Sequence, residues 1–121
     1  FTYIDDLVMG IRLLIDAIPT THTDRECQQS FESDSLSPVA PFRIVNIGNS
    51  DKVKLTDFID AIEEALNKKA IRNYMPMQIG DVPATWANSD LLNLLTGYRP
   101  QTNFKDGIRK FVEWFQDYYE K

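Results

Sequence analysis

The segment from Met75 to Thr85 contains the residues of this 121-residue chain that best suit ligand binding. It has no helical or strand periodicity, and it combines turn-forming residues with the polar side chains of Gln78 and Asp81. Asp81 follows Gly80, and glycine lets a backbone approach another group closely. A carboxylate at such a turn can accept hydrogen bonds from sugar hydroxyls. An aspartate in a turn can equally bond its own backbone, so both interpretations of Asp81 stay open at this point.

Patterns that would perform catalysis or hold a cofactor are missing. The five glycines do not form a Gly-rich phosphate loop, so the sequence has no dinucleotide-binding fingerprint. No tyrosine is followed four residues later by a lysine. With one histidine and one cysteine, no metal-ligand spacing exists. His22 and Cys27 lie in one polar segment, which we interpret as a coincidence of composition rather than a catalytic pair.

Helical periodicity accounts for most of the rest. Apolar residues recur at steps of three and four, which predicts amphipathic helices. The expected helices are 5–18, 55–66, 88–95 and 104–119. Pro19 ends the first of them, and Gly97 follows the third. Asn88 or Ser89 suits the start of the third helix, and Thr102 suits the start of the fourth.

Two short segments have the composition of strands. Residues 42–47 are β-branched and apolar and lie between Pro41 and Gly48, while residues 71–77 form a weaker candidate. The resulting order predicts an α/β fold, mainly helical, with two or three short strands. Two strands cannot form a stable sheet alone, so we expect them to pair with strands outside this chain.

Acidic pairs and aromatic residues on the helices receive structural interpretations. Asp5-Asp6 and Glu63-Glu64 are adjacent on a helix and point in different directions, which predicts solvated carboxylates or contacts with a helix N-terminus. Phe104, Phe111 and Phe115 share helical spacing, so we expect this stripe to lie in the core.

Residues 19–41 form a long polar loop that contains three prolines and almost no periodicity. Loops longer than about 12–15 residues are either functional or disordered, and the composition is compatible with disorder or with a lid-like excursion. The length predicts one domain, residues 1–121.

Charge and composition limit the partners. The chain has 43% hydrophobic and 26% charged residues and a net charge of -5, without a basic cluster. We therefore expect no nucleic-acid partner and no membrane partner. A single cysteine excludes an internal disulfide, which favours a cytoplasmic location.

Four motifs together resemble the extended short-chain dehydrogenases/reductases. Phe1-Thr2-Tyr3-Ile4-Asp5-Asp6 is similar to a conserved Phe-Thr-Tyr-Val-Asp-Asp segment, and Val45-Asn46-Ile47-Gly48-Asn49 to a Tyr-Asn-Ile-Gly-Asn strand end. The family's closing helices are matched by Leu95 to Thr102, Gly107 and Trp114-Phe115. Residues 75–85 resemble the Pro-Met-Gln-Pro-Gly-Asp-Val block of UDP-glucuronate 4-epimerases, with Ile79 in place of a proline.

The resemblance implies the C-terminal, substrate-binding part of an NAD-dependent nucleotide-sugar epimerase, without its Rossmann core. Such an enzyme inverts C4 of a UDP-sugar through a 4-keto intermediate, and the NAD-binding motif and the catalytic residues would lie outside this chain. The start at Phe1, without a methionine, is expected to be a cut through structure. The fragment alone is therefore expected to be inactive.

The same resemblance assigns three substrate-binding residues. Asp81 would contact the uridine ribose, Phe1 would lie near the nucleotide, and Gln78 would occupy a position where many relatives have a phosphate-binding arginine. A decarboxylase or dehydratase of the same family, or a UDP-hexose 4-epimerase, remains an alternative. A non-catalytic module that self-associates through exposed apolar surface is a further alternative.

Overall fold

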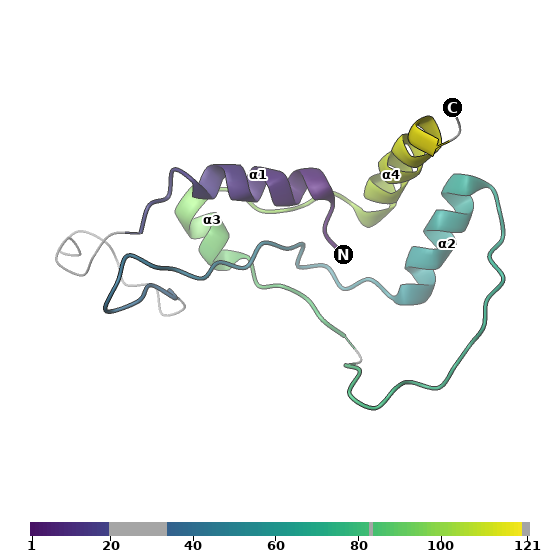
Figure 1. Cartoon of the computed structure of the whole chain (residues 1–121), viewed down its shortest axis with the longest axis horizontal. Helices are drawn as coiled ribbons and strands as arrows, with labels where there is room; N and C mark the ends of the chain where they lie inside the picture. The colour runs from purple at the N-terminus through teal and green to yellow at the C-terminus, as the bar shows by residue number, and fades with distance from the viewer. Residues whose placement is uncertain (20–33, 83, 120–121) are drawn as a thin grey trace.

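The computed structural model describes residues 1–19, 34–82 and 84–119, and within them the secondary structure consists of four α-helices. The helices are α1 (Ile4–Leu14), α2 (Leu55–Leu66), α3 (Asp90–Thr96) and α4 (Phe104–Tyr119). They pack in two pairs, α1 with α3 and α2 with α4, joined by long connections (Figure 1). None of the helices described is long and apolar enough to cross a membrane.

The four observed helices confirm the four helices predicted from the periodicity, but some of their ends differ. α1 ends at Leu14, before the expected Ile18, and the backbone continues in single turns through Ala17. α3 ends as expected at Gly97, whose φ of 71° places it in the left-handed region that glycine tolerates. Asn88 and Asn103 accept the backbone N–H of the residue two positions on, at 2.8 and 2.9 Å. The expected cap at Thr102 is therefore wrong.

The pair α2 and α4 encloses a small apolar core. Ala61, Ile108 and Val112 are buried at its centre. Half-buried apolar residues surround them, namely Phe58, Ile62, Ala65, Leu66 and Phe104. The apolar stripes of the two helices therefore face each other, as amphipathic patterning requires.

The pair α1 and α3 is centred on Leu92, which has no exposed surface. Gly10 of α1 lets the side chains of Ile47 and Leu92 approach the helix closely. A Cβ at this position would lie 2.8 Å from Cγ2 of Ile47 and 3.7 Å from Cδ2 of Leu92. The segment around Ile47 thus packs directly on α1, because glycine leaves room for it.

The predicted strands are not confirmed, because the described residues contain no strand. Residues 42–47 and 71–77 lie in irregular connections, and neither forms a ladder with a neighbouring segment. The hydroxyl of Ser35 hydrogen-bonds the C=O of Ile44 and accepts its N–H, so a side chain satisfies these backbone groups. Strand composition favours extended backbone, but a strand also needs a paired neighbour, and these segments have none in the part described.

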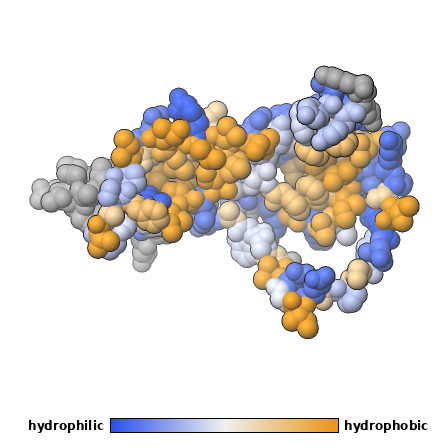
Figure 2. All heavy atoms as spheres, viewed as in Figure 1, coloured by the Kyte–Doolittle hydropathy of each residue, from blue (hydrophilic) through white to orange (hydrophobic). Residues whose placement is uncertain are grey.

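The aromatic stripe on α4 is only partly buried. Phe104 packs against the core, as expected, but Phe111 is 55% exposed and Phe115 is 41% exposed, so their assignment to the core is wrong. Figure 2 shows apolar side chains gathered in two areas of one face of the molecule. Two pairs of helices cannot cover all the apolar surface that four amphipathic helices present.

Most of the predicted 19–41 loop, residues 20–33, lies outside the described residues. The described end of the loop begins at Asp34 and is tied to Arg43, just after the loop. The Arg43 guanidinium donates to both carboxylate oxygens of Asp34 at 2.8 and 2.9 Å. The Arg43 side chain is only 7% exposed, so this bidentate pair fixes the end of the loop against the molecule.

A second close approach joins the connection before α2 to the connection before α3. A Cβ on Gly48 would lie 2.6 Å from the Cβ of Ala87. We expect Gly48→Ala to destabilise the fold by about 1–3 kcal/mol, the usual cost of overpacking. Urea unfolding of both proteins at equal concentration measures this loss.

The matched rescue is the double variant Gly48→Ala/Ala87→Gly, which returns the contact to one Cβ. The double variant should recover most of the stability that the single variant loses. An equal loss in both would show that the two backbones do not meet at this point.

Candidate functional site

Two cavities meet at the side chain of Phe1. Its ring stacks on the ring of Phe58 with centroids 3.9 Å apart and an angle of 15° between the planes. One cavity, of about 300 Å³, is apolar and lies among the N-terminal segment, α2 and α4. The other, of about 330 Å³, is more polar. Phe1 is therefore a wall shared by both cavities.

The more polar cavity is the better candidate for a polar ligand. Its lining comes from three segments that are far apart in the sequence, and it combines two carboxamides, two hydroxyls and two aromatic rings. The lining residues are Phe1, Thr2, Asn46, Asn49, Thr85, Trp86 and Ala87. Residues 46 and 49 belong to the quoted Val45–Asn49 motif, but no local pattern indicated Trp86.

Asn49 and Ser50 together join these three segments. Its backbone N–H donates to Oγ1 of Thr2 at 3.1 Å, and its side-chain amide donates to the C=O of Thr102 at 3.1 Å. Its carboxamide oxygen accepts the N–H of Asp51 at 3.0 Å. The neighbouring Ser50 donates to the C=O of Ala87 at 3.2 Å. The cavity walls are thus fixed by hydrogen bonds rather than by a sheet.

A buried carboxylate anchors the same framework. Asp6 is 8% exposed and accepts hydrogen bonds from the Tyr98 hydroxyl at 3.0 Å and from the Thr102 hydroxyl and N–H at 2.9 Å each. Burial raises the pKa of Asp6. The hydrogen bonds from Thr102, Tyr98 and the Gln101 backbone together lower it by more than burial raises it, so the net shift of the pKa is downward. Asp6 therefore stays ionised and acts as an acceptor.

Tyr98 acts as the donor in this pair. Burial, together with its hydrogen bond to the Asp6 carboxylate, raises the pKa of the Tyr98 hydroxyl to about 12. The phenol is protonated near neutral pH, so it cannot serve as a general base there. Asp6 lies in the first turn of α1, in agreement with the predicted contact with a helix N-terminus, but it is buried, so the alternative of a solvated carboxylate is wrong for Asp6. Asp6 and Tyr98 are 92 positions apart in the sequence, so no local pattern could indicate this contact.

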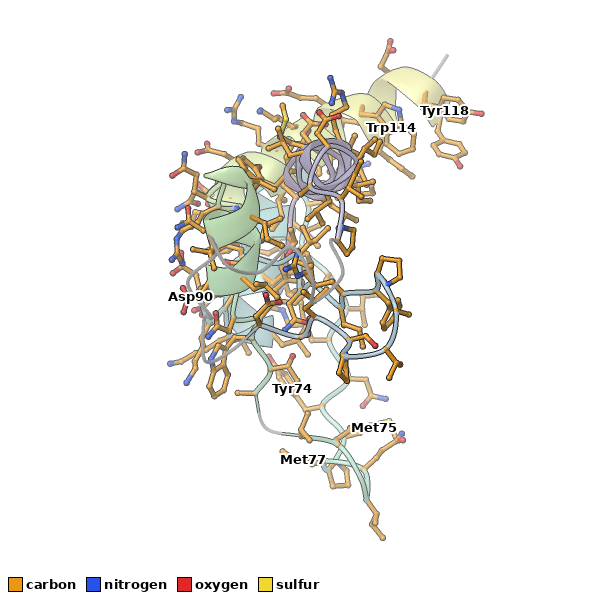
Figure 3. The ribbon with its side chains drawn as sticks, turned by 90° about the vertical axis from the view of Figure 1, so that its left-hand side faces the viewer. Tyr74, Met75, Met77, Asp90, Trp114 and Tyr118 are labelled. Atoms are coloured by element: carbon orange, nitrogen blue, oxygen red, sulfur yellow. The ribbon has the colours of Figure 1, made fainter. Side chains whose placement is uncertain are left out.

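Gln78 and Asp81 lie apart from the cavities. Both are exposed on the long excursion between α2 and α3, and neither lines a cavity. The Asp81 N–H donates to the C=O of Gln78 at 3.2 Å, and Gly80 in this turn has a φ of 101°. Figure 3 shows Met75 and Met77 at the far end of the same excursion, away from the helices. The structure therefore brings Gln78 and Asp81 together but leaves them apart from Phe1.

A second buried acid fixes the start of this excursion. Glu63, 6% exposed, accepts hydrogen bonds from Lys69 at 2.7 Å, from the Ala70 N–H at 3.0 Å and from Arg72. Hydrogen bonds from Lys69, Arg72 and Ala70 lower the pKa of Glu63 to about 2. Arg72 also bonds Asp60, and hydrogen bonds to its partners raise the pKa of its guanidinium. The prediction of a solvated carboxylate is wrong for Glu63 as well.

The described residues do not provide a cofactor or metal site. No group of three or more metal-ligating side chains gathers in residues 1–19, 34–82 and 84–119. A dinucleotide site needs a strand, a Gly-rich turn and a helix, and the described structure contains no such unit. The described residues thus do not fit NAD, and we assign none of its redox chemistry to them.

Comparison with known proteins gives matches along the whole chain. The probable UDP-glucuronate 4-epimerase of Rhizobium meliloti (strain 1021) is 42% identical over 121 residues, which cover all of this chain and 35% of that protein. The chain is homologous to UDP-glucuronate 4-epimerases. Protein CapI of Staphylococcus aureus is 40% identical over a match that covers all of this chain and 35% of CapI. UDP-glucuronate 4-epimerase 2 of Arabidopsis thaliana is 35% identical over a match that covers all of this chain and 26% of that protein.

This epimerase-related chain spans about a third of the length of the first two of these relatives. No protein-family model matches it. The homology confirms the family resemblance drawn from the motifs. The candidate site in this chain is the polar cavity at Phe1 together with the exposed turn of Gln78 and Asp81.

The Glu63 anchor predicts a specific response to acid. The folded-state pKa of about 2 lies below the ordinary value of 4.5, so the stabilisation is complete above pH 4.5 and is lost as pH falls toward 2. We expect Glu63→Gln to be less stable than wild type at pH 7 and to lose less stability between pH 5 and about 2. Urea unfolding across this pH range measures both effects.

The matched control is Glu64→Gln, since Glu64 is the adjacent acid and its side chain is 77% exposed. This variant should keep the wild-type acid response. If Glu63→Gln and Glu64→Gln behave alike, Glu63 does not anchor the excursion.

Proposed function

We propose that this chain is the C-terminal, substrate-side part of an NAD-dependent epimerase that inverts C4 of a UDP-sugar through a 4-keto intermediate, with UDP-glucuronate as the favoured substrate. The observation that carries the proposal is the match of the whole chain to relatives named as UDP-glucuronate 4-epimerases. The polar cavity supports it, because its amide, hydroxyl and aromatic groups suit a sugar-nucleotide. We further propose a cytoplasmic location for the parent protein.

The chain's part in this function is to bind and orient the substrate. Phe1 offers a ring at the cavity for the nucleotide, and Asp81 offers a carboxylate for the ribose hydroxyls. Gln78 lies at the same turn as Asp81 and offers a neutral amide to the phosphates. For these residues to share one ligand, the exposed excursion that carries Asp81 must approach the cavity. We propose that it does so in the parent protein.

The direct test is to incubate the full-length gene product that carries this chain with UDP-glucuronate and to identify the product by NMR. We expect the C4 epimer. We expect no turnover by residues 1–121 alone, because their sequence contains neither a dinucleotide-binding fingerprint nor a Tyr-x-x-x-Lys pair. Loss of CO₂ from the substrate, loss of water, or turnover of UDP-hexoses only would reject UDP-glucuronate epimerisation. Turnover by the 121-residue chain would reject its role as a binding part.

Asp81 provides a test at the level of one residue. In the full-length protein, Asp81→Asn should raise KM about 10-fold and leave kcat nearly unchanged, because a charged hydrogen bond worth about 1.5–3 kcal/mol is lost in both ground and transition state. Steady-state kinetics separates the two constants. Asp57→Asn, at an exposed acid of α2, is the control and should leave both constants unchanged. An unchanged KM in Asp81→Asn would remove this residue from the site.

The exposed aromatic residues of α4 favour a second property, self-association of the isolated chain. Trp114 is 53% exposed and Tyr118 is 62% exposed, and their rings stack with centroids 5.6 Å apart (Figure 3). Phe111 adds a third exposed ring 5.7 Å from Trp114. A contiguous apolar patch of this kind promotes association in water.

We expect the isolated chain to sediment as concentration-dependent oligomers, and we expect Phe111→Lys/Trp114→Lys to shift it toward monomer. The double variant adds two charges, so a control with the same added charge on the polar face is Glu113→Lys. Sedimentation velocity at several concentrations distinguishes them. A wild-type chain that is monomeric throughout would refute association through α4.

A further inference from the structure

Lys52 lies beside the polar cavity and is held there by an aromatic ring. Its ammonium nitrogen is 3.7 Å from the centroid of the Trp86 ring, and Trp86 is one of the two aromatic walls of the cavity. A cation over an indole face is attracted by the ring's electrons, and tryptophan gives the strongest attraction of this kind. The contact therefore brings a positive charge to the cavity from a residue that does not itself line it.

The lining of the cavity is electrically neutral. None of its seven residues carries a charged side chain. Asn46 is exposed at this position, and among the described residues no hydrogen bond of its carboxamide is found. Neutral amides and hydroxyls can orient a ligand, but a diphosphate binds strongly only where a cation compensates its charge. A sugar-nucleotide in this cavity would need a positive group from its surroundings.

Lys52 is suited to that role by its mobility and its place in the chain. It is exposed, and its flexible stem allows the ammonium to leave the Trp86 ring and reach a ligand. The acid beside it, Asp51, is also exposed, and its backbone N–H is bonded to Asn49. Lys54, two residues further on, directly precedes α2 and serves as its N-cap, without a contact to Trp86.

We infer that Lys52 is the phosphate-binding cation of the polar cavity: Trp86 holds its ammonium at the rim, and the diphosphate of a bound UDP-sugar takes over that contact. The inference rests on the proposed function for the identity of the ligand. It concerns binding only, and no bond to the ligand is made or broken. It assigns the charge recognition to a residue outside the motif that contains Asp81 and Gln78.

Titration calorimetry on the full-length gene product tests this with uridine, UDP and inorganic pyrophosphate as separate ligands. Lys52→Gln should weaken UDP and pyrophosphate binding about 10-fold, as loss of one charge-assisted contact implies, and leave uridine binding unchanged. Lys52→Arg should retain most of the affinity, because it keeps the charge. Lys54→Gln removes one charge from the same segment and should leave all three affinities unchanged.

The outcomes separate the inference from the proposed function. Equal losses in Lys52→Gln and Lys54→Gln, or a loss of uridine affinity in Lys52→Gln, would overturn the specific role of Lys52. A wild-type protein that binds pyrophosphate through Lys52 but neither uridine nor UDP would overturn the proposed function and leave the anion site standing. A wild-type protein that binds none of the three would overturn both.

Discussion

The carboxylate of Asp6 is the interaction on which most of this arrangement depends. It accepts hydrogen bonds from Tyr98 and Thr102, residues more than 90 positions away, and so ties the first turn of α1 to the link between α3 and α4. Thr102 also connects this link to the segment before α2, because its C=O accepts a hydrogen bond from the side-chain amide of Asn49. A buried acceptor with these donors cannot be removed without leaving them unsatisfied, which typically costs about 1–3 kcal/mol.

The arrangement depends on polar contacts because the apolar cores are small. Each pair of helices encloses its own cluster, centred on Leu92 in one and on Ile108 and Val112 in the other. Several large apolar side chains on α1 and α4 stay more than 40% exposed, so hydrophobic burial is incomplete in this chain. Ionised, hydrogen-bonded acids at Asp6 and Glu63 then decide how the long connections run between the pairs.

The candidate site follows from those connections. Its polar cavity forms where the N-terminal residues, the segment before α2 and the segment before α3 meet, and the tight contact of Gly48 with Ala87 sets the distance between two of its walls. The shape of the cavity therefore depends on backbone proximity and on Asn49 more than on any helix. The Gln78–Asp81 turn lies on a separate excursion, which Glu63 holds at its start.

The sequence by itself determined the helices, the glycine that ends α3 and the family resemblance, because periodicity, turn chemistry and motifs are local properties. Only the tertiary structure decided that residues 42–47 form no ladder, that Thr102 binds Asp6 instead of capping α4, and that Trp86 and Asn46 share a cavity with Phe1. The physical reason is that strand pairing, burial of an acid and the walls of a cavity depend on groups distant in the sequence. A local pattern states what a segment can form, and its partners in space decide what it does form.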